Sequence, residues 1–349
     1  MKTRKIGLTG MLFFLGVIAL SAQQTFKTTI YFDSPMLELA NDGYKTGPNK
    51  IDSWFNFRRA YFTYENKIND NLRFRFRYDA DYVKAVDKDG KKDDKLRPYI
   101  KHLYLEWSNL LIPNSVWQIG MAETLTFSAI EEKKWGYRSV AKTLLDGYKD
   151  VTGQGIDATS ADIGLSLSGT ITKMLRYAFQ VTNGAGYSHP EGDKYKKFAG
   201  RIHFVPLAGF SLVGYADYEQ QDDAGKKAST YKFDAYFEMI KGLTIGGTWF
   251  AYDNENNVLP GTTIRFNRSG LSIFGSMKLG DKFSLFGRYD NYEPNTEVVD
   301  DKTNLVIAGL DWCPVHSTFR IQPNIWFYSY EDSARKSDTV FALTFFMEF

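Results

Sequence analysis

Apolar and charged side chains alternate strictly along the segment from Leu72 to Tyr82. Successive side chains of a β-strand point to opposite faces, so this segment would carry large apolar groups on one face and charges on the other. The apolar positions are Leu72, Phe74, Phe76, Tyr78, Ala80 and Tyr82, and the charged positions are Arg73, Arg75, Arg77, Asp79 and Asp81. A strand of about eleven residues with two such faces fits either a soluble sandwich or a tilted strand that crosses an outer membrane.

Similar amphipathic segments recur to the end of the chain, with Val116 to Phe127 and Tyr231 to Ile240 among them. Short turns such as Asn69-Asp70-Asn71 and Lys241-Gly242 alternate with longer polar connectors such as Ala85 to Arg97. Outer-membrane barrels have an even number of strands, with short turns at one end and long loops at the other. The pattern therefore predicts an all-β protein, a transmembrane antiparallel β-barrel of about 16 strands.

The beginning of the chain has the pattern of an export signal. Lys2, Arg4 and Lys5 precede an apolar run from Ile6 to Leu20, and Ser21-Ala22 offers a small-residue cleavage site. The apolar run is short for a membrane helix, which needs about 20 residues. We expect residues 1–22 to be a signal peptide, with an uncleaved anchor as the alternative, and residues 23–349 to form one barrel domain.

The last predicted strand is apolar on one side and ends on the aromatic residue Phe349. Its apolar positions are Phe341, Leu343, Phe345, Met347 and Phe349. As a soluble edge strand this segment would be an aggregation hazard, whereas closure of a barrel removes unpaired edges. The segment resembles the carboxy-terminal signature that the barrel assembly machinery reads. We expect that machinery and membrane lipid as partners, and the outer membrane of a Gram-negative bacterium as the location.

Composition and charge exclude several classes of protein. Without residues 1–22, the chain has 40 basic and 41 acidic residues, since the signal carries three of the 43 basic residues and none of the 41 acidic ones. No basic excess points to nucleic acid. The histidines lie in no metal-binding or nucleophile motif, so we expect no enzyme, no metal and no cofactor. They are His102, His189, His203 and His316.

Arginines on the polar faces are the sharpest candidates for a functional role. Fixed cations along the wall of a wide pore attract anions. The candidate anion track consists of Arg73, Arg75, Arg77, Arg176, Arg201, Arg288 and Arg320. The alternative is a salt-bridged wall in which these arginines pair with Asp79, Asp81, Asp217, Asp234 and Asp290.

The longest connector, Ser128 to Ala161, follows the fifth predicted strand. A loop at this place in a porin commonly folds inward and narrows the pore, and long loops are often functional. The candidate constriction residues are Glu131, Glu132, Lys133, Lys134 and Arg138. An external lid or surface loop is the alternative.

Several short motifs resemble, in their order along the chain, the phosphate-selective porin O and P family. They are Phe57-Arg58-Arg59-Ala60-Tyr61, the alternating arginines of the next strand, Gln118-Ile119-Gly120, Val181-Thr182-Asn183-Gly184, Phe198 to Pro206, Gly287-Arg288-Tyr289-Asp290 and Ala308-Gly309-Leu310-Asp311-Trp312. The resemblance implies a sixteen-stranded porin with an arginine-lined path, assembled as a homotrimer.

Together these observations predict an outer-membrane porin. It would be a passive diffusion channel for small hydrophilic solutes, with a weak preference for anions and phosphate as a candidate solute. The alternative is a non-conducting outer-membrane barrel that acts as a scaffold, an adhesin or a subunit of a secretion complex.

Overall fold

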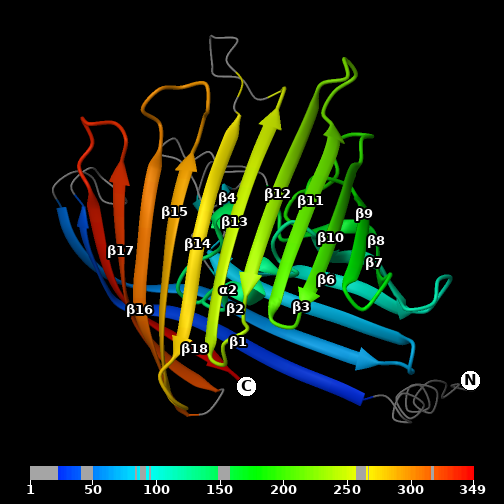
Figure 1. The fold of residues 1–349 in the computed structure, drawn as a ribbon, viewed down its shortest axis with the longest axis horizontal. Coiled ribbons are helices and arrows are strands. Elements are labelled where there is room, and N and C mark those ends of the chain that lie inside the picture. Colours follow the sequence, from blue (N-terminus) through cyan, green and yellow to red (C-terminus); the bar gives the residue numbers. More distant parts are fainter. Residues whose placement is uncertain are drawn as a thin grey trace, which may run out of the picture.

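The computed structural model describes residues 23–40, 50–82, 85–86, 92–93, 96–147, 158–256, 265, 267–315 and 318–349. The expected signal peptide, most of the predicted loop from Ala85 to Arg97, and His316 lie outside these residues. The described chain forms a closed barrel of sixteen strands (Figure 1). These strands are β1 (Gln23–Ala40), β2 (Lys50–Lys67), β3 (Leu72–Tyr82), β6 (Leu96–Ser108), β7 (Ser115–Glu123), β8 (Ala161–Thr170), β9 (Leu175–Thr182), β10 (Lys197–Leu207), β11 (Phe210–Gln220), β12 (Lys227–Phe237), β13 (Leu243–Asn254), β14 (Arg268–Lys278), β15 (Phe283–Glu293), β16 (Thr303–Val315), β17 (Phe319–Tyr330) and β18 (Asp338–Glu348). The two-residue strands β4 (Ala85–Val86) and β5 (Lys92–Asp93) pair with each other outside the barrel sheet.

Every barrel strand pairs antiparallel with its neighbours, and β1 closes the sheet against β18. At the closure, Thr28 N donates to Phe349 O at 2.7 Å and Phe349 N donates to Thr28 O at 3.0 Å. The predicted fold class, an all-β transmembrane antiparallel barrel of about 16 strands, is confirmed. In the described part of the chain, no helix is long and apolar enough to cross a membrane.

The two faces of each strand meet different surroundings, as the alternation predicted. On β3, Tyr78 is 41% exposed on the outside, whereas its neighbour Asp79 is 0% exposed on the inside. Phe179 and Phe233 are likewise exposed on the outer face, and Asp234 is buried on the inner one. The apolar outer face suits lipid, and the polar inner face lines the lumen.

One irregularity changes which residues face the lumen. Across β3 and β6, Arg77 pairs with His102 but Tyr78 pairs with Ile100, so Lys101 is the extra residue of a β-bulge. Lys101 and His102 are both buried on the lumen side. The bulge therefore places two consecutive polar side chains inside the barrel, where strict alternation allows one.

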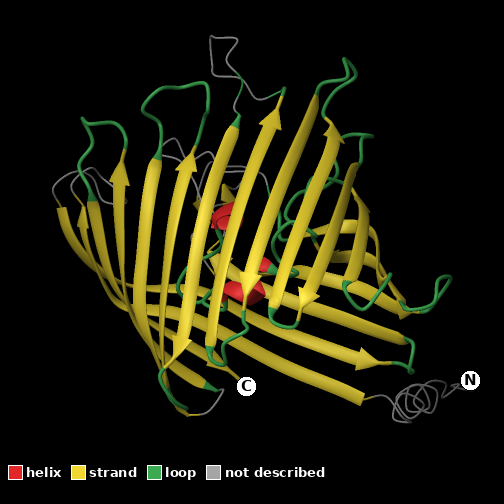
Figure 2. Ribbon diagram, in the orientation of Figure 1, coloured by secondary structure: helices red, strands yellow, loops and turns green. Residues whose placement is uncertain are grey.

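The segment after β7 leaves the wall and enters the barrel. The expected strand from Val116 to Phe127 ends at Glu123, and residues 124–147 carry two short helices, α2 (Glu131–Trp135) and α3 (Leu144–Gly147). Figure 2 shows these helices, in red, inside the ring of yellow strands. Trp135 is 1% exposed, packed with buried aromatic residues of the wall. We name residues 124–147 the inner loop.

The inner loop fills one side of the lumen. It forms two apolar clusters with the inner faces of strands from β11 to β17. The first contains Trp135, Tyr137, Val140, Ala141, Val213, Tyr236, Phe274, Phe286, Leu305, Ile307 and Tyr328. The second contains Phe127, Leu144, Leu145, Ala228, Phe250, Tyr252 and Tyr292. Burial of this apolar surface holds the loop to one wall and leaves open space against the opposite wall.

Candidate functional site

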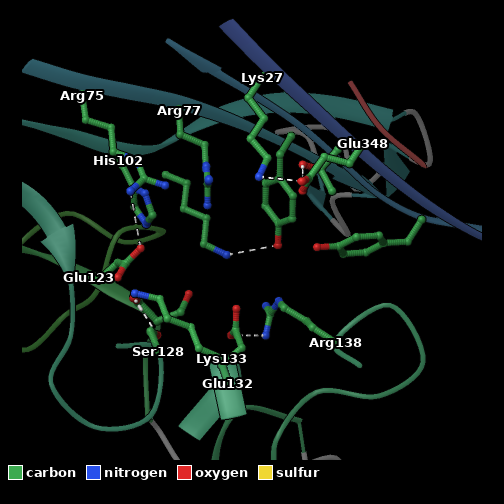
Figure 3. Close-up of a pocket in the computed structure, with 15 residues that line it drawn as sticks. Lys27, Arg75, Arg77, His102, Glu123, Ser128, Glu132, Lys133, Arg138 and Glu348 are labelled. Atoms are coloured by element: carbon green, nitrogen blue, oxygen red, sulfur yellow. Dashed lines mark hydrogen bonds and ion pairs between the residues drawn. The ribbon is translucent and has the colours of Figure 1, made fainter. Parts of the chain in front are cut away.

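A polar cavity lies between the inner loop and the wall formed by β1, β2, β3, β6 and β7 (Figure 3). It is a cavity of about 210 Å³, which we name the constriction cavity. Its lining residues are Lys27, Thr29, Tyr31, Tyr61, Arg75, Arg77, Lys101, His102, Glu123, Ser128, Glu132, Lys133, Arg138, Ser160 and Glu348. Six of these side chains are cationic lysines or arginines and three are carboxylates.

Arg75 and Arg77 reach the constriction cavity from β3. Arg75 Nε lies 3.4 Å from Glu65 Oε1, and its Nη1 lies 3.8 Å from Glu123 Oε1. Arg77 Nε donates to Thr63 Oγ1 at 2.8 Å, and its guanidinium lies 5.1 Å from the centre of the Tyr61 ring. No carboxylate of the described residues lies within ion-pair distance of Arg77. Thr63 and Tyr61 thus hold the guanidinium of Arg77 in place, and no carboxylate of the described residues neutralises its charge.

The alternation along β6 predicts that His102 faces the lumen, as it does, whereas Lys101 was missed as a candidate because it is the extra residue of the bulge. Lys101 Nζ lies 3.4 Å from Asp79 Oδ2 and 5.1 Å from the centre of the Tyr61 ring. Asp79 also accepts a hydrogen bond from Arg59 Nη1 at 2.7 Å. One carboxylate thus faces two cations, and a positive charge remains on this wall.

The opposite side of the constriction cavity is formed by the inner loop. Arg138 Nη1 donates to Glu132 Oε2 at 2.7 Å and is also paired with Asp146. Burial opposes ionisation of Arg138, but Asp146, Tyr61 and Glu132 together outweigh burial and hold its pKa well above the usual value. Burial likewise opposes ionisation of Asp146, yet Arg138 and Lys142 hold its pKa well below the usual range. These groups therefore remain charged. Lys133, on α2, is exposed and has no ion-pair partner among the described residues.

Glu131 and Lys134, the other loop candidates, face away from the constriction cavity and hold α2 to β12. Glu131 is 1% exposed, and its Oε2 lies 3.0 Å from Lys232 Nζ. Lys232 is also 2.5 Å from Asp234 Oδ1. Burial raises the pKa of Glu131 to about 7. Lys134 pairs with Glu238, just beyond the end of β12.

Arg288 and Arg320 contact the inner loop and do not line the constriction cavity. Arg288 Nη2 donates to Asp290 Oδ2 at 2.6 Å, and its Nη1 donates to the carbonyl of Lys142 at 2.6 Å. Its guanidinium lies 5.1 Å from the Trp135 ring. Arg320 pairs with Asp311 and lies 5.3 Å from the Tyr137 ring. Both arginines are placed to anchor the loop.

The remaining candidates lie elsewhere in the lumen. Arg73 pairs with Glu106 at 2.9 Å and with Glu65 at 3.5 Å, away from the constriction cavity. Arg176 and Arg201 line a separate cavity on the short-turn side of α2. The structure thus brings together Arg75 and Arg77 with Glu132, Lys133 and Arg138, and it separates the other members of the expected track.

The salt-bridged wall of the alternative hypothesis is present in part. Asp290 pairs with Arg288, whereas Asp79, Asp217 and Asp234 pair with cations that were not candidates. Those cations are Arg59 and Lys101 for Asp79, Lys197 for Asp217 and Lys232 for Asp234. The side chain of Asp81 lies outside the described residues. Among the described residues, no group of His, Cys, Asp or Glu is arranged to hold a metal ion.

No family model matches the chain, and no curated protein matches it by sequence. Solved structures of outer-membrane proteins are similar to it. The outer membrane channel DcaP of Acinetobacter baumannii is 11% identical, with a TM-score of 0.64 over 95% of this chain and 98% of that chain. An anion-selective porin from Comamonas acidovorans is 10% identical, with a TM-score of 0.63 over 94% of this chain and 100% of that chain. The trimer form of OmpT, an outer membrane protein of Vibrio cholerae, is 12% identical, with a TM-score of 0.57 over 94% and 100%. At these identities the likeness shows the shared barrel fold, and the resemblance to the porin O and P family stays a prediction.

Proposed function

We propose that the protein is an outer-membrane porin of a Gram-negative bacterium, a passive channel for small hydrophilic solutes with a weak preference for anions. The observation that carries the proposal is the charge of the constriction cavity, where six cations face three carboxylates. Two of these cations, Arg77 and Lys133, have no ion-pair partner among the described residues. Fixed cations at a narrow polar passage lower the energy of a passing anion and raise that of a cation.

Oligomeric state and partners follow from the same proposal. The similar structures include a trimer form, that of OmpT. Together with the family resemblance, this supports a homotrimer embedded in outer-membrane lipid. Insertion would depend on the barrel assembly machinery, which would read the final strand up to Phe349. Phosphate is the candidate solute that the family resemblance adds.

The test is the zero-current potential of the purified protein in a planar bilayer under a potassium chloride gradient. The native channel should show stepwise conductance and a potential set mainly by chloride. Replacement of Arg75 and Arg77 together by Ser should bring the chloride-to-potassium permeability ratio down toward one, because only four cations then face three carboxylates. Arg73→Ser is the matched control, since Arg73 lies on the same strand outside the constriction cavity.

The outcomes separate the two functional hypotheses. A double variant that is well folded but keeps the native ion preference would contradict the assignment of the filter to β3. Negligible conductance of a folded native barrel would favour the non-conducting scaffold. Reduction of the chloride current by added phosphate would support phosphate as a solute.

A further inference from the structure

A second cavity lies on the short-turn side of α2, between the inner loop and strands β7 to β10. It has a volume of about 680 Å³, and we name it the inner cavity. Four cations reach it: Lys133 and Lys134 from α2, Arg176 from β9 and Arg201 from β10. Arg176 and Arg201 do not line the constriction cavity, so the proposed anion filter gives these two arginines no role.

Three of these cations, all but Lys134, are not paired with the acidic group of the inner cavity. Glu238 is the carboxylate in its lining, and it pairs with Lys134. Among the described residues, no carboxylate lies within ion-pair distance of Lys133, Arg176 or Arg201. Arg201 Nη1 donates a hydrogen bond to the backbone carbonyl of Leu125 at 3.3 Å. Three positive charges therefore share one space without a counter-charge from the described chain.

Strand register brings two of these cations close to each other and to a histidine. Arg176 on β9 is directly opposite His203 on β10, and Arg201 is opposite Ala178. Direct cross-strand partners have Cβ atoms about 5 Å apart, and diagonal partners remain within reach of long side chains. His203 Nε2 is buried and has no hydrogen-bond partner in the structure. The two guanidinium groups, at diagonal positions, repel each other, and an anion between them would offset that repulsion.

The rest of the lining defines the chemistry of the ligand. Ser168 and Thr170 of β8 supply hydroxyl groups that can donate to an oxyanion. Val116 of β7, with Ala129 and Ile130 of the inner loop, supplies an apolar side. A bare inorganic anion would leave that apolar surface in contact with water. A carboxylate joined to a small apolar body would meet the cations at one end and the apolar side chains at the other.

We propose that the inner cavity is a second binding site, which takes small organic carboxylates on their way through the barrel. Lys133 lines both cavities, so it connects this site to the constriction cavity. The inference deepens the proposed function by naming a class of solute. In this site Arg176 and Arg201 would bind the carboxylate of the solute, and Val116 and Ile130 would contact its apolar body.

The test measures binding and not current, so that it does not depend on conduction. Isothermal titration of the detergent-solubilised protein with benzoate should give saturable binding, weaker binding of acetate, and no binding of benzyl alcohol. Arg176→Ser combined with Arg201→Ser should weaken benzoate binding roughly tenfold or more, because the carboxylate loses its charge-assisted hydrogen bonds to both guanidinium groups. Arg73→Ser is the control and should leave benzoate affinity unchanged, because Arg73 lines neither cavity.

Folding is checked by the heat-modifiable mobility of each variant on gels. Lys133→Ala is a second variant, at an exposed position of α2, and it should also weaken benzoate binding because Lys133 lines the inner cavity. Benzoate affinity that is unchanged in the Arg176 and Arg201 variant would overturn the inference, even for a channel that conducts. Equal affinity for benzoate and acetate would show that the apolar part of the solute gains nothing from contact with Val116 and Ile130, and would overturn that part of the proposal. Benzoate binding by a barrel that does not conduct would support this site and reject the porin function.

Discussion

Replacement of Trp135 by Ala should release the inner loop from the wall. The Trp135 ring lies 5.4 Å from that of Tyr137, 5.6 Å from that of Phe274 and 6.1 Å from that of Phe286. Its Nε1 donates to the carbonyl of Ala141 at 2.8 Å. The side chain is thus the centre of the contact between the loop and strands β14 and β15.

The magnitude follows from burial. Truncation of a fully buried aromatic side chain to Ala costs about 3–5 kcal/mol, and loss of the stacked Arg288 guanidinium removes roughly another 0.5–2 kcal/mol. A loss of about 4 kcal/mol changes the equilibrium between seated and released loop by roughly a factor of 10³. Release would take Lys133 and Arg138 out of the constriction. We therefore expect higher single-channel conductance and a lower chloride preference.

Planar-bilayer recording of single channels measures both quantities. Trp249→Ala is the matched control, because Trp249 is 47% exposed on the outer face of β13 and does not contact the loop clusters. Its conductance and ion preference should equal those of the native channel. If Trp135→Ala keeps native conductance, ion preference and thermal unfolding, the loop is not held by this aromatic cluster and the reasoning fails.

Two further predictions concern the loop and the wall. Because the pKa of Glu131 rises from 4.5 to about 7 on burial, its ionisation costs roughly 3 kcal/mol, and this cost appears as the pH rises from about 4.5 through 7. Urea unfolding in lipid vesicles should therefore show native stability falling between pH 5 and 8 relative to Glu131→Gln, and a constant difference between the two proteins would contradict this. Gly164→Ala should prevent pairing of β8 with β9, since an added Cβ would lie 2.1 Å from Val181 O, whereas Gly214→Ala meets nothing within 4 Å and should fold normally. A heat-modifiable folded band for Gly164→Ala, as strong as that for Gly214→Ala, would refute the argument.

The alternation of side chains was enough to predict the barrel wall. Leu72–Tyr82 is a strand with the predicted bounds, because every second residue must suit lipid and no other period meets that need. The strand predicted from Val116 to Phe127 is too long, because β7 ends at Glu123. An apolar residue such as Phe127 fits both a lipid-facing strand position and the packed interior of the barrel. It packs inside the barrel with Phe250 and Tyr292 in place of facing lipid. Local pattern cannot distinguish these two apolar environments.

The roles of the lumen cations were less accessible to sequence reasoning. Arg77 and Arg288 are both arginines on inner faces, yet one faces the constriction and the other holds the loop. What separates them is a partner distant in sequence: Arg288 bonds to the carbonyl of Lys142. Lys101 was missed for a local reason, because a one-residue bulge reverses the alternation at that point. Neither kind of information is contained in the period of the pattern.

Pairing of β1 with β18 has a consequence for how the protein is made. β1 and β18 are the first and last strands of the barrel, and β1 gains its second neighbour only when β18 pairs with it. Until then both edges of the growing sheet are open, and such edges invite aggregation. The long separation of the two strands also makes closure a slow step. A copy truncated before β18 would keep two unpaired edges, so loss of the final strand would favour aggregation over closure of the barrel.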